Sequence, residues 1–283
     1  MPQRLTKQQL DNWKRDGVLV LPGFSEAVTL HALAQRAGEI VDAFEPPAQV
    51  PVFSSRDRAA LSERALVESA NQVRCFFEQE ALDADGRLAV PKSQAINKIG
   101  HALHDREPLF ERFSRDARLA AVLAELDLVD PRLMQSMLIF KQPRIGGEVV
   151  WHQDATYLIA EPQTVIGLWF ALEDAALDNG CLWVAPGGHR GPLRERFEQQ
   201  ADGSFAMRQL DATPWPNGAA TTPLEVEAGT LVVFDGLLPH GSAPNRSDRS
   251  RLAYSLHAVD GRSKWSPLNW LQRRADDPAR GFG

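Results

Sequence analysis

The stretch Glu148-Val149-Val150-Trp151-His152-Gln153-Asp154 places a His-x-Asp pair at the end of a short apolar run. His240 comes shortly after a second strand-like run, Gly229 to Phe234. Two imidazoles and one carboxylate on one side of an ion leave its opposite coordination positions free, an arrangement typical of non-haem Fe(II) oxygenases. We therefore interpret His152, Asp154 and His240 as a candidate iron site.

The composition is that of an ordinary globular protein. The chain has 283 residues, of which 43% are hydrophobic and 24% charged. No apolar run approaches the ~20 residues of a membrane helix, and Met1 to Leu5 lack the apolar core of a signal peptide. We expect a cytoplasmic protein. The net charge of -6 argues against general binding to nucleic acid, and the two cysteines, Cys75 and Cys181, are expected to be reduced and structural.

Helical signals dominate up to about residue 130. Thr6 to Gln9 reads as a capping box, and Gly17 is placed to end that helix. After the buried strand predicted for residues 18–21, Ser25 is expected to cap a long amphipathic helix that ends before Pro46. Another helix is predicted from about Arg115 to Leu126. Between them, residues 48–90 are less periodic and are interpreted as part of a lid or substrate wall, with a strand at 72–77 and a turn at 83–86.

After Pro131 the pattern changes to short strands without intervening helices. The predicted strands are 134–140, 149–152, 165–172, 181–185, 224–226, 230–234 and 252–259. This pattern favours a mainly β fold with helical additions: a double-stranded β-helix, the jelly-roll or cupin-like core, at about 131–260, with the earlier helices covering one outer face. We expect a single domain over residues 1–283. The polar segment 192–223 is interpreted as an excursion over the barrel mouth.

The remaining histidines fit other roles better than metal binding. His31 is expected on a helix surface, His101 and His104 in structural positions, and His189 in a turn that it helps to fix. His257 shares a strand face with Arg251 and is expected near the site without being a ligand.

Several segments together carry a resemblance to a known family. They are His152-Gln153-Asp154, the run from Gly180 to Arg190, and His240-Gly241-Ser242 through Arg251. These segments resemble the phytanoyl-CoA dioxygenase family of Fe(II)/2-oxoglutarate oxygenases. The similarity runs from Leu10 to Leu271 and includes the stretches 96–104 and 265–270.

The resemblance implies roles for individual residues. It makes His152, Asp154 and His240 the iron ligands and Arg251 the partner of the distal carboxylate of 2-oxoglutarate. It also implies that the cosubstrate site is lined by Lys98, Met137, Trp169 and Ser242.

The strand pattern agrees with these roles. Trp169 shares its strand face with Gly167 and Ala171, which we interpret as leaving room for a ligand. Arg251 alternates with small residues and would be an unpaired buried charge without an anion.

The implied function is hydroxylation of a small organic substrate with Fe(II), 2-oxoglutarate and dioxygen, and with release of succinate and carbon dioxide. Neither nucleic acid nor membrane is an expected partner. One alternative is a non-haem iron halogenase, which needs halide in the place of the carboxylate, so that Asp154 argues against it. Another is a non-catalytic jelly-roll metal-binding or sensor protein, which succinate release would distinguish. No phosphate-binding surface for a CoA thioester is assigned from the sequence.

Overall fold

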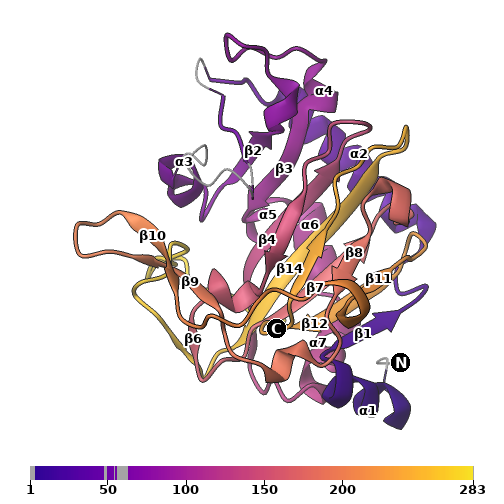
Figure 1. Ribbon diagram of the computed structural model, residues 1–283, viewed down its shortest axis with the longest axis vertical. Helices are drawn as coiled ribbons and strands as arrows, with labels where there is room; N and C mark the ends of the chain where they lie inside the picture. Colours follow the sequence, from indigo (N-terminus) through magenta and orange to yellow (C-terminus); the bar gives the residue numbers. More distant parts are fainter. Residues whose placement is uncertain (1–3, 48–49, 54, 56–62, 283) are drawn as a thin grey trace.

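The large sheet forms the centre of the molecule (Figure 1). The computed structural model describes residues 4–47, 50–53, 55 and 63–282. In spatial order, the seven antiparallel strands of this sheet are β1 (Val18–Leu21), β12 (Leu231–Asp235), β7 (Ile166–Ala171), β14 (Arg251–Asp260), β4 (Pro131–Lys141), β3 (Ile96–His101) and β2 (Val73–Phe77).

A smaller four-stranded sheet faces it. Its order is β11 (Thr222–Leu224), β8 (Leu182–Val184), β13 (His240–Ser242) and β5 (Val149–His152). The strand predicted at 224–226 lies earlier in the chain, at β11, because Val226 instead forms an isolated bridge with Ala175. Two short pairs complete the β structure: β9 (Glu195–Gln199) with β10 (Phe205–Gln209), and β6 (Ala160–Glu161) with β15 (Lys264–Trp265). Two sheets face to face are the expected jelly-roll core.

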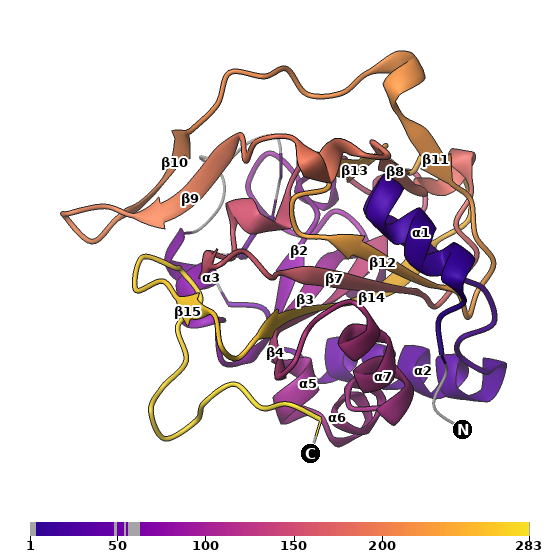
Figure 2. The same cartoon turned by 90° about the horizontal axis from the view of Figure 1, so that it is seen from below.

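Helices cover the outer face of the large sheet. Figure 2 shows α2, α5, α6 and α7 on one side of this sheet and β8, β11 and β13 on the other. The helices are α1 (Lys7–Asp16), α2 (Ala27–Ala43), α3 (Glu63–Glu68), α4 (Lys92–Ala95), α5 (Leu103–Arg106), α6 (Pro108–Ser114) and α7 (Ala117–Glu125).

The predicted helix boundaries are correct at α1 and wrong at the start of α2. The Thr6 capping box and the left-handed Gly17 at the C-terminal end of α1 are both present. Ser25, however, is not the cap of α2, which begins after Glu26. The buried Ser25 instead donates its backbone N–H to the carbonyl of Gly229, and a tertiary contact thus replaces the local cap.

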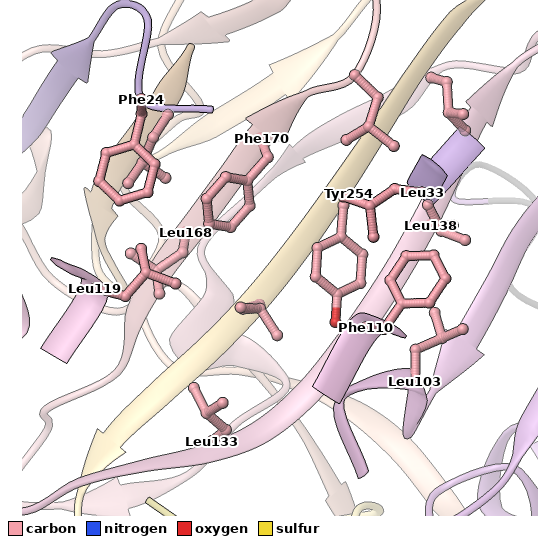
Figure 3. Close-up of a cluster of buried hydrophobic side chains, with 14 of the residues drawn as sticks. Phe24, Leu33, Leu103, Phe110, Leu119, Leu133, Leu138, Leu168, Phe170 and Tyr254 are labelled. Atoms are coloured by element: carbon pink, nitrogen blue, oxygen red, sulfur yellow. The ribbon is translucent and has the colours of Figure 1, made fainter. Parts of the chain in front are cut away.

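The main hydrophobic core lies between these helices and the large sheet (Figure 3). Phe110 and Phe113 from α6 contact Tyr254 of β14, whose hydroxyl lies 2.8 Å from Ser114 Oγ. Phe170 of β7 packs edge-on against Phe113, with ring centroids 4.8 Å apart. The core joins the helix-rich first part to the strands that follow residue 130, and we therefore propose that the chain forms one domain.

The segment 192–223 contains a hairpin that the sequence did not predict. Strands β9 and β10 extend beyond the two sheets in Figure 1. Phe197 and Phe205 stack on each other at a centroid distance of 5.7 Å, although the surrounding sequence is polar. In the less periodic segment 48–90, strand β2 and the turn at Asp83 are present, while residues 48–49, 54 and 56–62 lie outside the described part.

Within the described ranges, no helix has both the length and the apolar character needed to cross a bilayer. Cys75 and Cys181 are buried and unpaired, as expected of reduced structural cysteines.

Leu168 gives a direct test of the core. It is fully buried on β7, whereas Val28 on α2 is 72% exposed. Leu168→Ala should lower the free energy of unfolding by about 2–5 kcal/mol, because it removes packed methyl groups and leaves a cavity. Val28→Ala should change it by less than about 0.5 kcal/mol. Urea unfolding monitored by circular dichroism measures both, and equal effects would contradict the assigned core.

Candidate active site

A cavity of about 430 Å³ lies between the two sheets. Most of the described residues that line it come from β3, β4, β7, β12 and β14 of the large sheet, from β5, β8 and β13 of the small sheet, and from the β9–β10 hairpin. All eight residues selected from the sequence line this cavity: Lys98, Met137, His152, Asp154, Trp169, His240, Ser242 and Arg251.

The two candidate histidine ligands are neighbours across the small sheet. His152 ends β5, His240 begins β13, and the strand register pairs them directly. Asp154 opens the short 3-10 helix that follows β5, and its Oδ1 lies 3.7 Å from Nε2 of each histidine. These three ligand atoms all lie within 4.8 Å of one another, a spacing at which they could hold a single metal ion.

Backbone contacts fix the tautomers of both histidines. Nδ1 of His152 lies 2.9 Å from the carbonyl of Val150, and Nδ1 of His240 lies 3.0 Å from that of Leu238. A carbonyl only accepts, so each Nδ1 carries a proton, and Nε2 is the ring nitrogen that faces Asp154 in both histidines. Burial, followed by the neighbouring His240, lowers the pKa of His152 to about 4. This histidine is therefore neutral and ready to bind a cation at neutral pH.

Gly167 allows Asp154 to approach the large sheet. A Cβ at this position would lie 2.3 Å from the Phe234 ring and 2.8 Å from Asp154 Oδ2. The space that we interpreted as room for a ligand beside Trp169 is thus filled, at Gly167, by these two side chains. Burial alone would raise the pKa of the Asp154 carboxyl, but His257, His240 and His152 outweigh burial and hold it well below its usual range.

His257 contacts the second oxygen of this carboxylate. Its Nε2 lies 3.2 Å from Asp154 Oδ2, in a close electrostatic contact that lacks regular hydrogen-bond geometry. Among the described residues, the cluster that could hold a metal consists of His152, Asp154 and His240, and excludes His257. The strand parity of residues 251–257 placed His257 near the site, but only the fold reveals its contact with Asp154.

Arg251 is a buried cation without a visible anion. It is 1% exposed, and its Nε and Nη1 make no hydrogen bond within the described structure. Its guanidinium carbon lies 5.4 Å from the centre of the Trp169 ring. Burial lowers its pKa to about 10, so that the guanidinium remains charged at neutral pH. A desolvated, unpaired guanidinium of this kind is suited to a carboxylate ligand.

The other predicted cosubstrate residues surround the same space. Lys98 is buried, with Nζ 3.4 Å from the centre of the Phe53 ring, and burial lowers its pKa to about 7. Met137 and Trp169 flank Ser255 of β14 in the strand register. The hydroxyl of Ser242 is buried without a partner among the described residues.

Lys141 is a buried basic residue of the cavity that was not predicted from the sequence. It pairs with Arg251 in the strand register, is 1% exposed, and donates from Nζ to the carbonyls of Ala243 (2.8 Å) and Gly147. We predicted that its strand ends at residue 140, which left Lys141 in a loop. The alternation of Gln135, Met137 and Ile139 on one face was the signal that would have extended this face to residue 141.

The remaining histidines are placed largely as expected. His31 is exposed, and His189 lies in the short turn 188–190. His104 is buried between the hydroxyl of Ser136 and the carboxylate of Asp105, consistent with a structural role. His101 also contacts a buried hydroxyl, but it differs from His104 in lining the cavity.

Comparison with known proteins places the chain in a family. Residues 13–253 match the family model described as Phytanoyl-CoA dioxygenase (PhyH). "Phytanoyl-CoA dioxygenase 1" of Oryza sativa subsp. japonica is 42% identical over 272 residues, covering 95% of each chain. "Phytanoyl-CoA dioxygenase domain-containing protein 1" of Mus musculus is 40% identical over 282 residues, covering 97% of each.

Solved structures share the fold at lower identity. EctD from S. alaskensis, solved with 2-oxoglutarate and 5-hydroxyectoine, aligns with a TM-score of 0.63 and 22% identity over 97% of this chain and 86% of that one. The epimerase SnoN, solved with Fe3+, alpha ketoglutarate and nogalamycin RO, aligns with a TM-score of 0.66 and 16% identity over 97% and 91%.

The jelly-roll fold, the cluster of two histidines and one carboxylate, and these relatives together place the chain in a class of protein, the Fe(II)/2-oxoglutarate-dependent dioxygenases. Within this class, the chain belongs to the phytanoyl-CoA dioxygenase family.

The candidate ligands can be tested by metal content. His152→Ala and His240→Ala should each abolish tight Fe(II) binding without unfolding the protein, because each removes one of three protein ligands. The exposed His31→Ala serves as the control and should bind iron normally. Iron is measured by elemental analysis after anaerobic reconstitution, alongside circular dichroism. Full iron content in a folded His152 or His240 variant would refute the assignment.

Arg251→Leu tests the cosubstrate contact. Loss of a desolvated bidentate partner costs roughly 2–5 kcal/mol, or about 30-fold to several-thousand-fold in 2-oxoglutarate affinity, with iron binding retained. Arg251→Lys should recover only part of this loss, because an ammonium lacks the planar fork. Arg249 lies on the surface and pairs with Asp178, so Arg249→Leu is the matched control. The affinities are measured by anaerobic titration with 2-oxoglutarate. Weaker 2-oxoglutarate binding by the Arg249 variant, together with wild-type binding by the Arg251 variant, would contradict the assigned register.

Proposed function

We propose that this dioxygenase hydroxylates a small organic substrate, with release of succinate and carbon dioxide. The observation that carries the proposal is the presence in one cavity of the His152, Asp154 and His240 cluster and of a buried guanidinium that has no anion among the described residues. The relatives of Oryza sativa and Mus musculus support a dioxygenase, and the structural neighbours, solved with 2-oxoglutarate and in SnoN also with iron, support iron and 2-oxoglutarate as its partners.

The donor set fits a divalent iron ion. Nε2 of His152 and Nε2 of His240 both face Asp154 Oδ1, so that one carboxylate and two imidazoles would hold the ion. Asp154 Oδ2 is turned toward His257 and the large sheet. This arrangement leaves Oδ1 as the oxygen available for coordination.

The residues at the Arg251 end would hold 2-oxoglutarate. Arg251 would pair with the 5-carboxylate, so that the keto acid end is directed along the cavity toward the histidines. Trp169 and Met137 would form the walls beside it, and Ser242 and Lys98 supply polar atoms. These contacts bind and orient the cosubstrate.

Bound Fe(II) and 2-oxoglutarate supply the oxidative decarboxylation that turns dioxygen and 2-oxoglutarate into succinate, carbon dioxide and one oxygen atom for insertion into a C–H bond. The chain contributes position and exclusion of water. Phe197, Phe205 and Met207 from the β9–β10 hairpin, with Tyr157 and Leu158, give the cavity an apolar wall that keeps bulk water from the substrate.

Two other functions fit less well. A halogenase needs an open position for halide, which Asp154 would fill. A metal-binding protein without turnover would have no use for an unpaired buried arginine, whose desolvation destabilises the fold unless an anion binds. Succinate release with Fe(II), 2-oxoglutarate and a panel of metabolites tests the proposal, and no succinate above the metal-free background would refute it.

Asp154→Gly tests the hydroxylation chemistry. The change removes the charged oxygen ligand and should abolish hydroxylation, while opening a position that chloride can occupy. Product analysis by mass spectrometry follows both the hydroxylated and the chlorinated product. Hydroxylation at the wild-type rate would contradict the assigned role of Asp154.

A further inference from the structure

Three neutral polar side chains lie on the cavity wall beside the metal cluster. They are His101 of β3, Gln135 of β4 and Trp270, which follows β15, and all are buried. Gln135 pairs with His257 in the strand register, and His257 contacts Asp154. This group, here called the His101 subsite, therefore lies near the carboxylate ligand, whereas Arg251 is six residues away along β14, toward the other end of the strand.

His101 presents an acceptor atom. The Ser69 hydroxyl lies 2.6 Å from the carbonyl of Leu66 and donates to it, so this hydroxyl must accept from His101 Nδ1, 2.8 Å away. Burial, with contributions from Lys98 and His257, holds the pKa of His101 well below its usual value, and the ring is neutral. Its proton is therefore on Nδ1, and Nε2 carries a lone pair. This Nε2 has no partner within the described residues.

Trp270 presents a donor atom next to it. The rings of His101 and Trp270 are 5.0 Å apart and nearly perpendicular. The indole Nε1–H of Trp270 is buried and has no acceptor in the described structure. By contrast, the indole of Trp265 donates to the carbonyl of Leu271 at 2.9 Å. Buried donors and acceptors rarely remain unpaired, so two neighbouring rings of the cavity lining, one with an unpaired donor and the other with an unpaired acceptor, point to a ligand.

The unpaired acceptor Nε2 of His101 and the unpaired donor Nε1–H of Trp270 limit the chemical groups that can bind here. A carboxylate has no proton to donate to the lone pair of His101 Nε2. An ammonium group cannot accept a hydrogen bond from the indole N–H of Trp270. A hydroxyl or a carboxamide can donate and accept at once, and Gln135 offers both functions beside it.

We propose that the His101 subsite binds a neutral hydroxyl or carboxamide group of the primary substrate, whose remaining body is apolar. Calling this ligand the substrate rests on the proposed function. The apolar body would lie against the wall formed by Phe197, Phe205 and Met207. Polar anchoring beside Asp154 then holds the adjacent C–H bonds close to the metal cluster.

The test compares six-carbon compounds that differ only in their end group. Binding of hexanamide, 1-hexanol and hexanoate is measured by calorimetry on the protein loaded anaerobically with Fe(II) and 2-oxoglutarate. The wild type should bind hexanamide and hexanol at least about 10-fold more tightly than hexanoate, because the carboxylate leaves His101 Nε2 unpaired. Equal affinities, tighter binding of hexanoate, or no measurable binding of the neutral compounds would overturn the proposal.

Matched variants locate the contact. Trp270→Phe removes the unpaired indole N–H and should weaken hexanamide binding roughly 3- to 10-fold, the effect of one hydrogen bond. Trp265→Phe makes the same change outside the cavity and should leave this affinity unchanged. His101→Phe should also weaken hexanamide binding, and Trp270→Phe decides the outcome if that variant does not fold. Equal affinities in the two tryptophan variants would overturn the assignment.

The proposed His101 subsite and the proposed dioxygenase reaction are tested by different measurements, so that either can be refuted without the other. Binding without dioxygen reports on the His101 subsite even if nothing is turned over. Succinate release by the wild type, measured on its own, reports on the dioxygenase reaction.

Discussion

The burial of both faces of β14 is the constraint on which the structure depends. Side chains alternate along a strand, so that the residues from Leu252 to Ala258 at even positions enter the helix-side core, while Arg251, Ser255 and His257 at odd positions line the cavity. A slip of one residue would exchange the two sets and place the guanidinium of Arg251 against the helices. The apolar core therefore fixes the register of the active site.

The two ends of the cavity differ in charge for a structural reason. Arg251 and Lys141 are paired in adjacent strands at one end, where Nζ of Lys141 already donates to backbone carbonyls, whereas Nε and Nη1 of Arg251 have no partner among the described residues. The Arg251 end of the cavity can therefore bind an anion. At the other end, the neutral His101 and the indole of Trp270 offer one acceptor and one donor. A dicarboxylate would thus bind at the Arg251 end of the cavity, and a neutral polar group would bind at the His101 end.

The sequence predicts well those features that depend on periodicity. The alternation in 165–172 separates the core face of β7 from its cavity face, and the structure confirms this separation. The position of Arg251 on the cavity face follows from the same reasoning. The His-x-Asp pair could be placed at a strand end because β5 is a short apolar run with clear limits.

Features that depend on residues distant in the sequence could not be predicted from periodicity. Ser25 has the local pattern of a helix cap, but its backbone is held by Gly229, about two hundred residues later. The β9–β10 hairpin lies outside both sheets, so most of its residues are polar and resemble a loop. The acceptor role of His101 depends on the hydroxyl of Ser69, in a separate segment of the chain. Periodicity carries no information about such pairs.

Gly167 shows how the absence of a side chain can set the geometry of a metal site. Asp154 comes from a short 3-10 helix rather than from a strand, so that no ladder of backbone hydrogen bonds fixes its carboxylate directly. Its position is instead limited on one side by β7, where only a glycine admits Oδ2, and on another by His257. With Oδ2 held in this way, Oδ1 has to face the two histidines. The large sheet thus orients the carboxylate of Asp154, although Asp154 is not part of that sheet.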